Sequence, residues 1–242
     1  ASAPAARTSL KQIRELVGRV KVEDIDRDTV RQFMDARSTK DKPNSVRRKT
    51  AVMLKMLNEA YAEGLMARHV KAPKQPRRAQ PNHRCLTDDE EARLRRIMSH
   101  DSHEYGQLVT TLVDTGMRLG EALDMEWKAV KPDFSSVTVV QSKTGRVRSI
   151  PLTKRVEQIF RDKIFSHKPK PWTVDRSAMY RSWRKARSFM GLDSDSGFTP
   201  HALRHTFASR LIQRGAPLEV VKTLMGHAKM DQTLEYAHLA PE

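Results

Sequence analysis

The segment TPHALRHTFASRL, residues 199–211, decides the fold of the C-terminal half of the chain. Thr199 followed by Pro200 predicts a helix start, because threonine is a favoured N-cap and proline fits the first helical position. Apolar side chains then recur every four residues and predict one buried stripe, made of Leu203, Phe207 and Leu211. Another face of the same helix carries His201, Arg204, His205 and Ala208.

Further helices and one hairpin are predicted around this segment. Thr87 and Glu90 form a capping box, which marks a helix start. Helical spacing of apolar residues marks four more stretches: 94–98, 105–113, 156–160 and 179–190. Two β-branched runs separated by a short turn predict a hairpin, with strands at 137–140 and 146–150.

The N-terminal part reads as a separate helical domain. Its three apolar patterns lie at 10–17, 30–34 and 46–61, and Gly64 follows as a helix C′ residue. A proline-rich stretch without apolar periodicity comes next and favours an extended connector. We predict a helical domain at 1–75, a basic linker at 76–84 and a second domain at 85–242. The fold class is mainly α with a small antiparallel β-sheet (α+β).

The charge balance concerns the partner of the chain. The 242 residues hold 45 Lys and Arg against 29 Asp and Glu, a net charge of +16. Residues 1–75 are the more densely cationic part, with 17 basic and 9 acidic side chains. A solvated basic face is one explanation, and a polyanionic partner, above all nucleic acid, is the other.

Composition excludes several classes of protein. With 38% hydrophobic residues the chain can bury a large core or two smaller ones, which excludes a disordered tail. We expect no membrane segment and no signal peptide, because no apolar run is long enough for either. Cys85 is the single cysteine, so it forms no internal disulfide and favours a reducing compartment. We therefore expect the cytoplasm.

Four short motifs in the second domain place basic side chains and a tyrosine in a fixed order. The first three are TGMRLGE at 115–121, HALRHTFAS at 201–209 and LMGH at 224–227, and TLEYAH at 233–238 is the fourth. Arg118 follows a glycine turn, with Glu121 one helical turn later, where a carboxylate can hold the guanidinium. His201 and Arg204 project from one face near a helix N-terminus, where an anion is favoured.

These motifs, in this order and spacing, resemble the catalytic signatures of the tyrosine recombinases of the phage integrase family. The resemblance implies a helical core-binding domain at 1–75, which lacks its first helix or begins further upstream, and a mixed catalytic domain after the linker. It also implies a covalent exchange of DNA strands that needs neither a cofactor nor a metal ion. The expected partner is double-stranded DNA.

The resemblance assigns a role to each motif residue. Arg118 and Arg204 would clamp the nonbridging oxygens of a DNA phosphate, and Tyr236 would attack the phosphorus. His201 would accept or position the tyrosine proton, while His227 would donate a hydrogen bond to the phosphate. Two further residues complete the expected set: Lys143, which would protonate the leaving 5′ oxygen, and Glu121, which would support Arg118.

Other basic residues are candidates for holding the duplex. Three lie on one predicted helix whose apolar face carries Val46, and they should point to phosphates or the major groove: Arg47, Arg48 and Lys49. Two lie in the linker, Arg77 and Arg78. Two flank the hairpin turn and should reach the DNA backbone near Lys143: Arg146 and Arg148.

Several conspicuous side chains are set aside as structural. We expect His205 and His238 to be structural or peripheral and Cys85 to be inert. The remaining tyrosines should pack on helices: Tyr61, Tyr105 and Tyr180. The tryptophans should lie in the core or an interface: Trp127, Trp172 and Trp183.

The leading hypothesis is a site-specific recombinase that integrates or excises a mobile element through a Holliday junction. It would act as a homotetramer on two duplexes, with accessory directionality proteins, and associate with the nucleoid. A chromosome-dimer-resolving recombinase is the alternative within the family. A type IB topoisomerase uses the same nucleophile, and a silent DNA-binding relative would lack catalysis.

Overall fold

The computed structural model describes residues 3–77, 83–141, 145–165 and 168–241. The chain divides into two compact units, Ala1–Pro81 and Asn82–Glu242, here called the N-terminal and C-terminal units. Helices dominate both, and the described strands form one two-stranded antiparallel sheet. The predicted fold class is confirmed. No helix in the described part of the chain has the length and apolar character that crossing a membrane requires.

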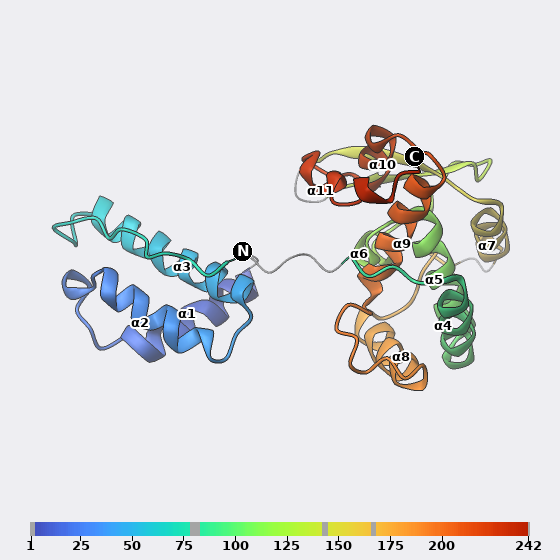
Figure 1. Ribbon diagram of the computed structural model, residues 1–242. Coiled ribbons are helices and arrows are strands. Elements are labelled where there is room, and N and C mark those ends of the chain that lie inside the picture. The colour runs from blue at the N-terminus through green and yellow to red at the C-terminus, as the bar shows by residue number, and fades with distance from the viewer. Residues whose placement is uncertain (1–2, 78–82, 142–144, 166–167, 242) are drawn as a thin grey trace. The chain divides into compact units, whose positions relative to one another are not determined.

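The N-terminal unit is a three-helix layer around a small core (Figure 1). Its elements are α1 (Ala3–Val17), the short 3₁₀ helix η1 (Val22–Asp24), α2 (Arg27–Ser38) and α3 (Pro43–Ala62). Asp26 caps α2 by accepting a hydrogen bond from the Thr29 backbone N–H at 2.8 Å. Residues from all three helices and the loop after α3 fill the core: Ile13, Val30, Phe33, Met53, Leu57 and Met66.

The predicted basic face of α3 is only partly exposed. Lys49 lies one turn after the buried Val46, so it is buried too, and its Nζ contacts Asp41 Oδ2 at 2.7 Å. Arg47 is half-buried and donates to the Pro76 carbonyl at 2.9 Å. Arg48 is exposed. Lys49 is therefore a structural cation rather than the free DNA-binding cation we expected, because helical periodicity places it on the apolar side.

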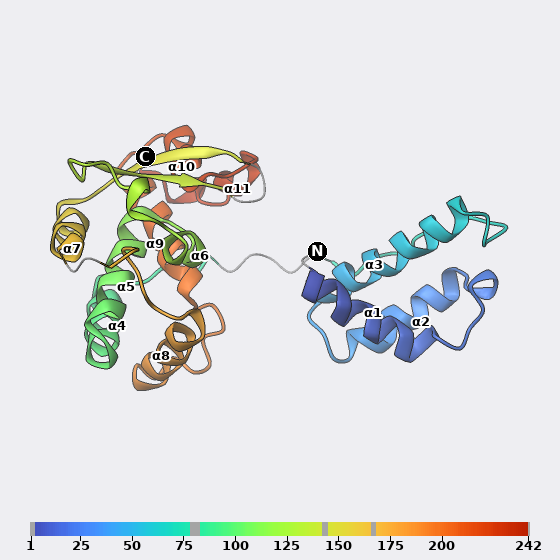
Figure 2. The same ribbon diagram turned by 180° about the vertical axis from the view of Figure 1, so that it is seen from behind.

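The C-terminal unit wraps eight α-helices, two 3₁₀ helices and a hairpin, as far as it is described, around a larger core (Figures 1 and 2). Its first half comprises α4 (Asp88–Asp101), α5 (His103–Thr115), α6 (Leu119–Leu123), η2 (Trp127–Ala129), β1 (Ser136–Val140) and β2 (Val147–Pro151). Its second half comprises α7 (Lys154–Ile164), α8 (Arg176–Phe189), α9 (Pro200–Gln213), α10 (Leu218–Met225), α11 (Asp231–Leu234) and η3 (Ala237–Leu239).

Helix α9, which contains the segment quoted first, runs through the middle of this unit in both views (Figures 1 and 2). It begins at Pro200, as predicted, but the Thr199 side chain makes no capping hydrogen bond. Leu203 and Phe207 are buried, and so are Arg204 and Ala208 on the face we expected to be separate. The helix is thus enclosed on most sides, which brings its basic face inside the unit.

The hairpin and the ends of the helices agree with the sequence patterns. Val140 pairs with Val147 across the antiparallel strands, and the turn residues 142–144 lie outside the described residues. Thr87 and Glu90 form the predicted capping box of α4. Trp172 and Trp183 are buried in the core, as expected.

The predicted linker, 76–84, extends beyond the boundary between the units. Arg84 belongs to the C-terminal unit, where it donates to Glu90 Oε2 and Asp195 Oδ2, each at 2.8 Å. The two carboxylates hold the guanidinium in place and raise the pKa of Arg84. Arg84 is therefore anchored within the C-terminal unit rather than in the predicted linker.

Candidate active site

Arg204 is a buried cation at the centre of the C-terminal unit. It is 2% exposed, and its two terminal nitrogens donate to the carbonyls of Gly116 and Met225. Gly116 has a φ of +61°, and a Cβ there would come within 2.3 Å of the Phe207 ring, so only glycine permits this approach. Arg204 makes no hydrogen bond or ion pair with a carboxylate of the described residues. Burial, followed by repulsion from Arg118 and Arg148, lowers its pKa to about 9.

Glu121 joins two further arginines beside Arg204. Arg118 donates its backbone N–H and its guanidinium to the two Glu121 oxygens, each at 2.8 Å, which is the pair that the spacing predicted. Arg148 also donates through Nη2 to Glu121 Oε2 at 2.6 Å. Burial alone would raise the pKa of Glu121, but the hydrogen bonds from Arg148 and Arg118 lower it to about 2. Glu121 is therefore an anion that orients both guanidinium groups.

The position of Arg148 corrects our expectation of a DNA-backbone contact. Its side chain is 4% exposed, because alternate residues of β2 face inward and Arg148 shares that face with Ile150. Besides Glu121, it donates through Nε to the Leu224 carbonyl at 2.9 Å. Gln141, at the other end of the turn, donates to the Gly226 carbonyl at 2.6 Å. The hairpin is thus fastened to the end of α10.

These contacts fix the loop that carries His227. Gly226 has a φ of +64°, and His227 Nδ1 lies 2.9 Å from Thr233 Oγ1. Burial, then the nearby Arg204, lowers the pKa of His227 to about 4. Burial and Arg204 also lower the pKa of His201, which projects from the first turn of α9. Both imidazoles are therefore neutral at pH 7 and can donate or accept a hydrogen bond.

Tyr236 lies in the segment after α11 and is 2% exposed. Its hydroxyl hydrogen-bonds to Nδ1 of His205, the histidine that we set aside as structural or peripheral. No described hydrogen bond joins Tyr236 to His201, whose ring instead meets the His205 ring edge-on, with centroids 4.8 Å apart. Burial raises the pKa of Tyr236 and lowers that of His205 to about 3, so the phenol is protonated and the imidazole is neutral.

Sequence reasoning missed the contact between His205 and Tyr236 because 31 residues separate them. One signal was present: His205 is four residues after His201, so both lie on one face of α9. His238, the other histidine set aside, is exposed. Cys85 is half-buried, and burial raises the pKa of its thiol, which agrees with an inert side chain.

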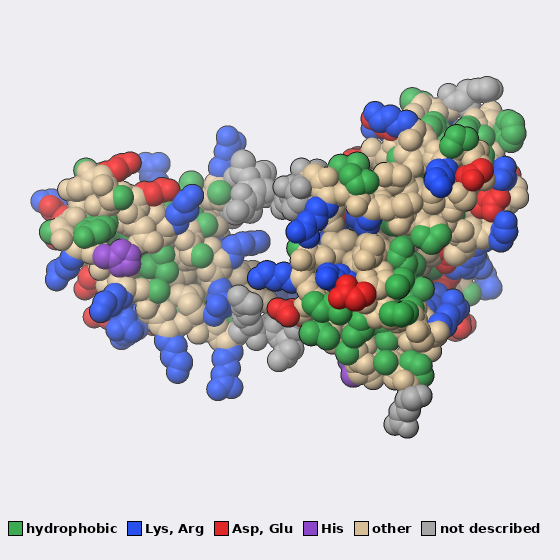
Figure 3. Space-filling view, turned by 90° about the horizontal axis from the view of Figure 1, so that it is seen from above, with side chains coloured by type: hydrophobic (Ala, Val, Ile, Leu, Met, Phe, Trp, Pro, Cys, Tyr) green, Lys and Arg blue, Asp and Glu red, His purple; other side chains and the backbone are tan. Residues whose placement is uncertain are grey.

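The remaining expected residues lie on the surface or outside the described residues. Arg77 and Arg146 are exposed, whereas Lys143 and Arg78 fall outside the described residues. Lys and Arg side chains are spread over the visible faces of both units (Figure 3).

A cavity of about 770 Å³ beside Arg118 is lined by residues of α6, η2 and β1. No group of three or more His, Cys, Asp or Glu side chains suited to a metal ion occurs among the described residues.

This arrangement suits a reaction in which an oxygen nucleophile attacks a bound anion. Arg118 and Arg148 share the Glu121 carboxylate, and Arg204 stands near them without a carboxylate partner among the described residues. The two neutral imidazoles of His201 and His227 lie close to these arginines. The buried phenol of Tyr236, in the segment after α11, contacts α9 through His205 and is close enough for Arg204 to lower its pKa against the effect of burial. A phosphate diester would supply the negative charge that this cluster lacks.

Comparisons with known proteins identify the family of the chain. Residues 84–242 match the phage integrase family. The integrase of Escherichia phage P2 is 29% identical over 208 residues, which cover 85% of this chain and 58% of that protein. Tyrosine recombinase XerD of Brucella abortus is 30% identical over 149 residues, covering 56% of this chain and 48% of that protein. The chain thus spans about half the length of these relatives.

Solved structures share the fold. A lambda integrase dimer bound to a COC' core site has a TM-score of 0.80 at 21% identity, covering 96% of this chain and 70% of that one. The recombinase XerH bound to a palindromic difH substrate has a TM-score of 0.81 at 16% identity, covering 97% and 75%. At 16% and 21% identity, these similarities show a shared fold and nothing more.

Proposed function

Since the chain belongs to the phage integrase family, we propose that it is a site-specific DNA recombinase that cuts and rejoins strands through a 3′-phosphotyrosyl intermediate. The observation that carries the proposal is the buried Arg204, which has no carboxylate partner among the described residues and stands beside Arg118 and a buried phenol. A buried cation needs an anion to offset its desolvation, and a DNA phosphate would be that anion.

In this mechanism the arginines stabilise charge on the phosphate. Arg118 and Arg204 donate to the nonbridging oxygens, where negative charge grows in the transition state. Glu121 holds Arg118 in place, and Arg148 in turn holds Glu121. His227 donates a hydrogen bond to the same phosphate, and His201 receives or orients the tyrosine proton.

The bond changes balance without an added energy source. The Tyr236 oxygen forms a bond to phosphorus as the bond from phosphorus to the 5′ oxygen of the DNA breaks. The departing oxygen takes a proton, which we assign to Lys143. A 5′ hydroxyl from the second duplex then attacks the phosphotyrosine, and the phenol leaves. Because one ester replaces another, the exchange needs no nucleotide cofactor.

The expected assembly is also part of the proposal. The N-terminal unit acts as the core-binding domain, with the exposed Arg48 and Arg77 on phosphates, and Arg146 contributes from the hairpin. The lambda integrase relative was crystallised as a dimer on its core site, which supports DNA as the partner. We propose four protomers on two duplexes, assisted by directionality proteins, on nucleoid DNA in the cytoplasm. Integration or excision of a mobile element is our preferred role.

A nicked suicide duplex tests the proposal. The cognate site is first selected from a library of random duplexes by binding to the chain. The selected site is then nicked beside the scissile phosphate, so that cleavage releases a short fragment that diffuses away and leaves the adduct trapped. We expect a covalent adduct with the chain and none with Tyr236→Phe. No adduct on any selected site would overturn the proposal. Strand exchange between two duplexes is the expected second result, whereas relaxation of supercoils without exchange would indicate a topoisomerase.

A further inference from the structure

His83 covers the candidate nucleophile, although it lies directly after the predicted linker and outside every motif. The rings of His83 and Tyr236 are 5.0 Å apart between centroids. The His83 ring also meets the His205 ring edge-on at 4.7 Å, and their Nδ1 atoms are 3.2 Å apart. His83 therefore packs against both members of the tyrosine–imidazole hydrogen bond.

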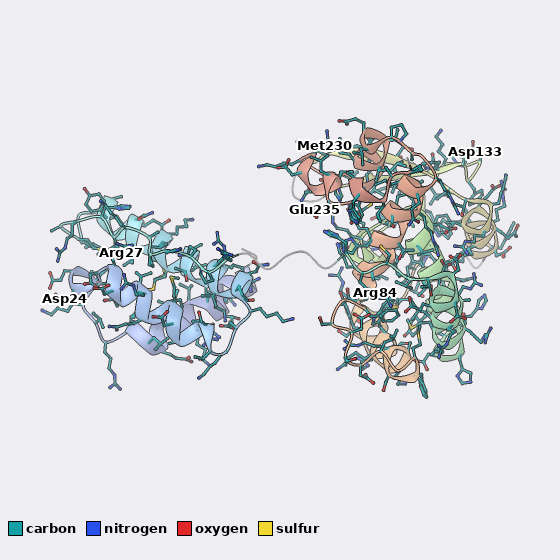
Figure 4. All side chains as sticks on the ribbon, in the orientation of Figure 1. Asp24, Arg27, Arg84, Asp133, Met230 and Glu235 are labelled. Carbon is teal, nitrogen blue, oxygen red and sulfur yellow. The ribbon has the colours of Figure 1, made fainter. Side chains whose placement is uncertain are left out.

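Glu235 fastens His83 to the segment that carries the tyrosine. Its Oε2 lies 2.7 Å from His83 Nε2, at an angle poorly aligned for a hydrogen bond, so the contact is an ion pair when the imidazole is protonated. Glu235 is 40% exposed and directly precedes Tyr236, just after α11 (Figure 4). Glu235 thus connects His83 to the tyrosine segment on the exposed side. His205 contacts both His83 and Tyr236 on the buried side.

This arrangement opposes the reaction that we propose for Tyr236. The hydroxyl bonds to His205, and no described hydrogen bond connects it to Arg118 or Arg204. To attack a phosphate held by those arginines, the hydroxyl must first leave His205. Contacts that hold the phenol in its present place raise the barrier to that movement.

We propose that His83 and Glu235 form a latch that holds Tyr236 against His205 until DNA is bound. The role of the latch in cleavage rests on the proposed function, whereas its effect on the tyrosine does not. His83 and Glu235 are positioning residues, since they act through the place of Tyr236 and touch no reacting phosphate.

Tyrosine nitration measures the latch on the full chain without DNA. Tetranitromethane is applied at about pH 6.5, near the ordinary pKa of a histidine side chain, and peptide mass spectrometry then follows each tyrosine separately. Tyr61 and Tyr180 are 45% and 46% exposed and serve as internal standards. We expect His83→Ala and Glu235→Gln each to speed nitration of Tyr236 by about fivefold relative to these standards, as for the loss of a partly exposed ion pair and its packing. His238→Ala, which changes an exposed histidine of the same segment, is the matched control and should leave the rate unchanged.

Two results would overturn the latch. One is an unchanged rate of Tyr236 nitration in both variants. The other is a parallel rise at the half-buried Tyr105, which would mean general loosening of the unit. The first-order rate of adduct formation on the nicked duplex should rise in the same two variants. Faster nitration without faster adduct formation would refute the claim that the latch slows the attack of Tyr236 on the phosphate. No adduct in any variant, with nitration as expected, would instead overturn the proposed function and leave the latch standing.

Discussion

Replacing Glu121 with glutamine removes the negative charge that Arg118 and Arg148 share. Folding lowers the pKa of Glu121 from 4.5 to about 2, which corresponds to about 3 kcal/mol. Its side chain is 13% exposed at the edge of the site, so solvent screening reduces this figure to roughly 2 kcal/mol. The glutamine keeps the size and one acceptor, which confines the change to the charge. We expect Glu121→Gln to lower the melting temperature of the C-terminal unit by about 4–8 °C at pH 7.

The pH dependence has a definite sign. Because folding lowers this pKa, the carboxylate stabilises the folded chain at pH values above 4.5 and loses that effect as the pH falls toward 2. Urea unfolding of both chains at pH 7, 5, 4 and 3 should therefore show the difference between wild type and Glu121→Gln shrinking below pH 4.5. A difference that stays constant from pH 7 to pH 3 would refute the argument that Glu121 acts through its charge.

Three other substitutions test separate parts of the structure. Arg204→Lys loses the paired donation to the Gly116 and Met225 carbonyls, and we expect single-turnover adduct formation to fall by about a hundredfold or more; a loss under tenfold would contradict the clamp. Lys49→Met should destabilise the N-terminal unit by about 1 kcal/mol and leave the salt dependence of DNA binding unchanged. Arg48→Ala should instead reduce the log–log slope of the DNA-binding constant against salt concentration by about one. Equal effects of the two variants on this slope would refute the distinction between a structural Lys49 and a DNA-binding Arg48. Gly226→Ala places a Cβ 2.6 Å from Gln141 Nε2 at a positive φ, so it should destabilise the C-terminal unit by at least about 1 kcal/mol in thermal unfolding, and an unchanged melting temperature would contradict the tight approach of the hairpin.

Local patterns in the sequence predict much of this fold because their causes are local. The capping box at Thr87 depends on residues three positions apart, and so does the pair between Arg118 and Glu121. The hairpin follows from two β-branched runs and a short turn. Each of these features is settled within a few residues, so spacing alone was sufficient.

The same periodicity could have corrected two of the DNA-binding predictions. Arg148 alternates with exposed neighbours on β2 and shares the inward face of Ile150, and Lys49 is one helical turn from Val46. In both cases we assigned the residue to DNA binding because it is basic, without regard to the face of the strand or helix on which it lies. A charged side chain on an apolar face needs a buried partner, and Glu121 and Asp41 are those partners.

Contacts between distant segments could not be predicted in this way. His205 meets Tyr236 across 31 positions, and His83 meets His205 across 122. Nothing near His83 in the sequence marks it, because its surroundings come from α9 and from the segment after α11. The four motifs identified the candidate residues, and only the packing of α9 shows which histidine holds the tyrosine.

The most direct test of the central claim is to identify the residue that carries DNA. The adduct from the nicked duplex is digested with protease and nuclease, and mass spectrometry locates the attached nucleotide. The account predicts a single modified residue, Tyr236, linked through a 3′ phosphate. Attachment to Tyr61, Tyr105 or Tyr180, or a link through a 5′ phosphate, would contradict it.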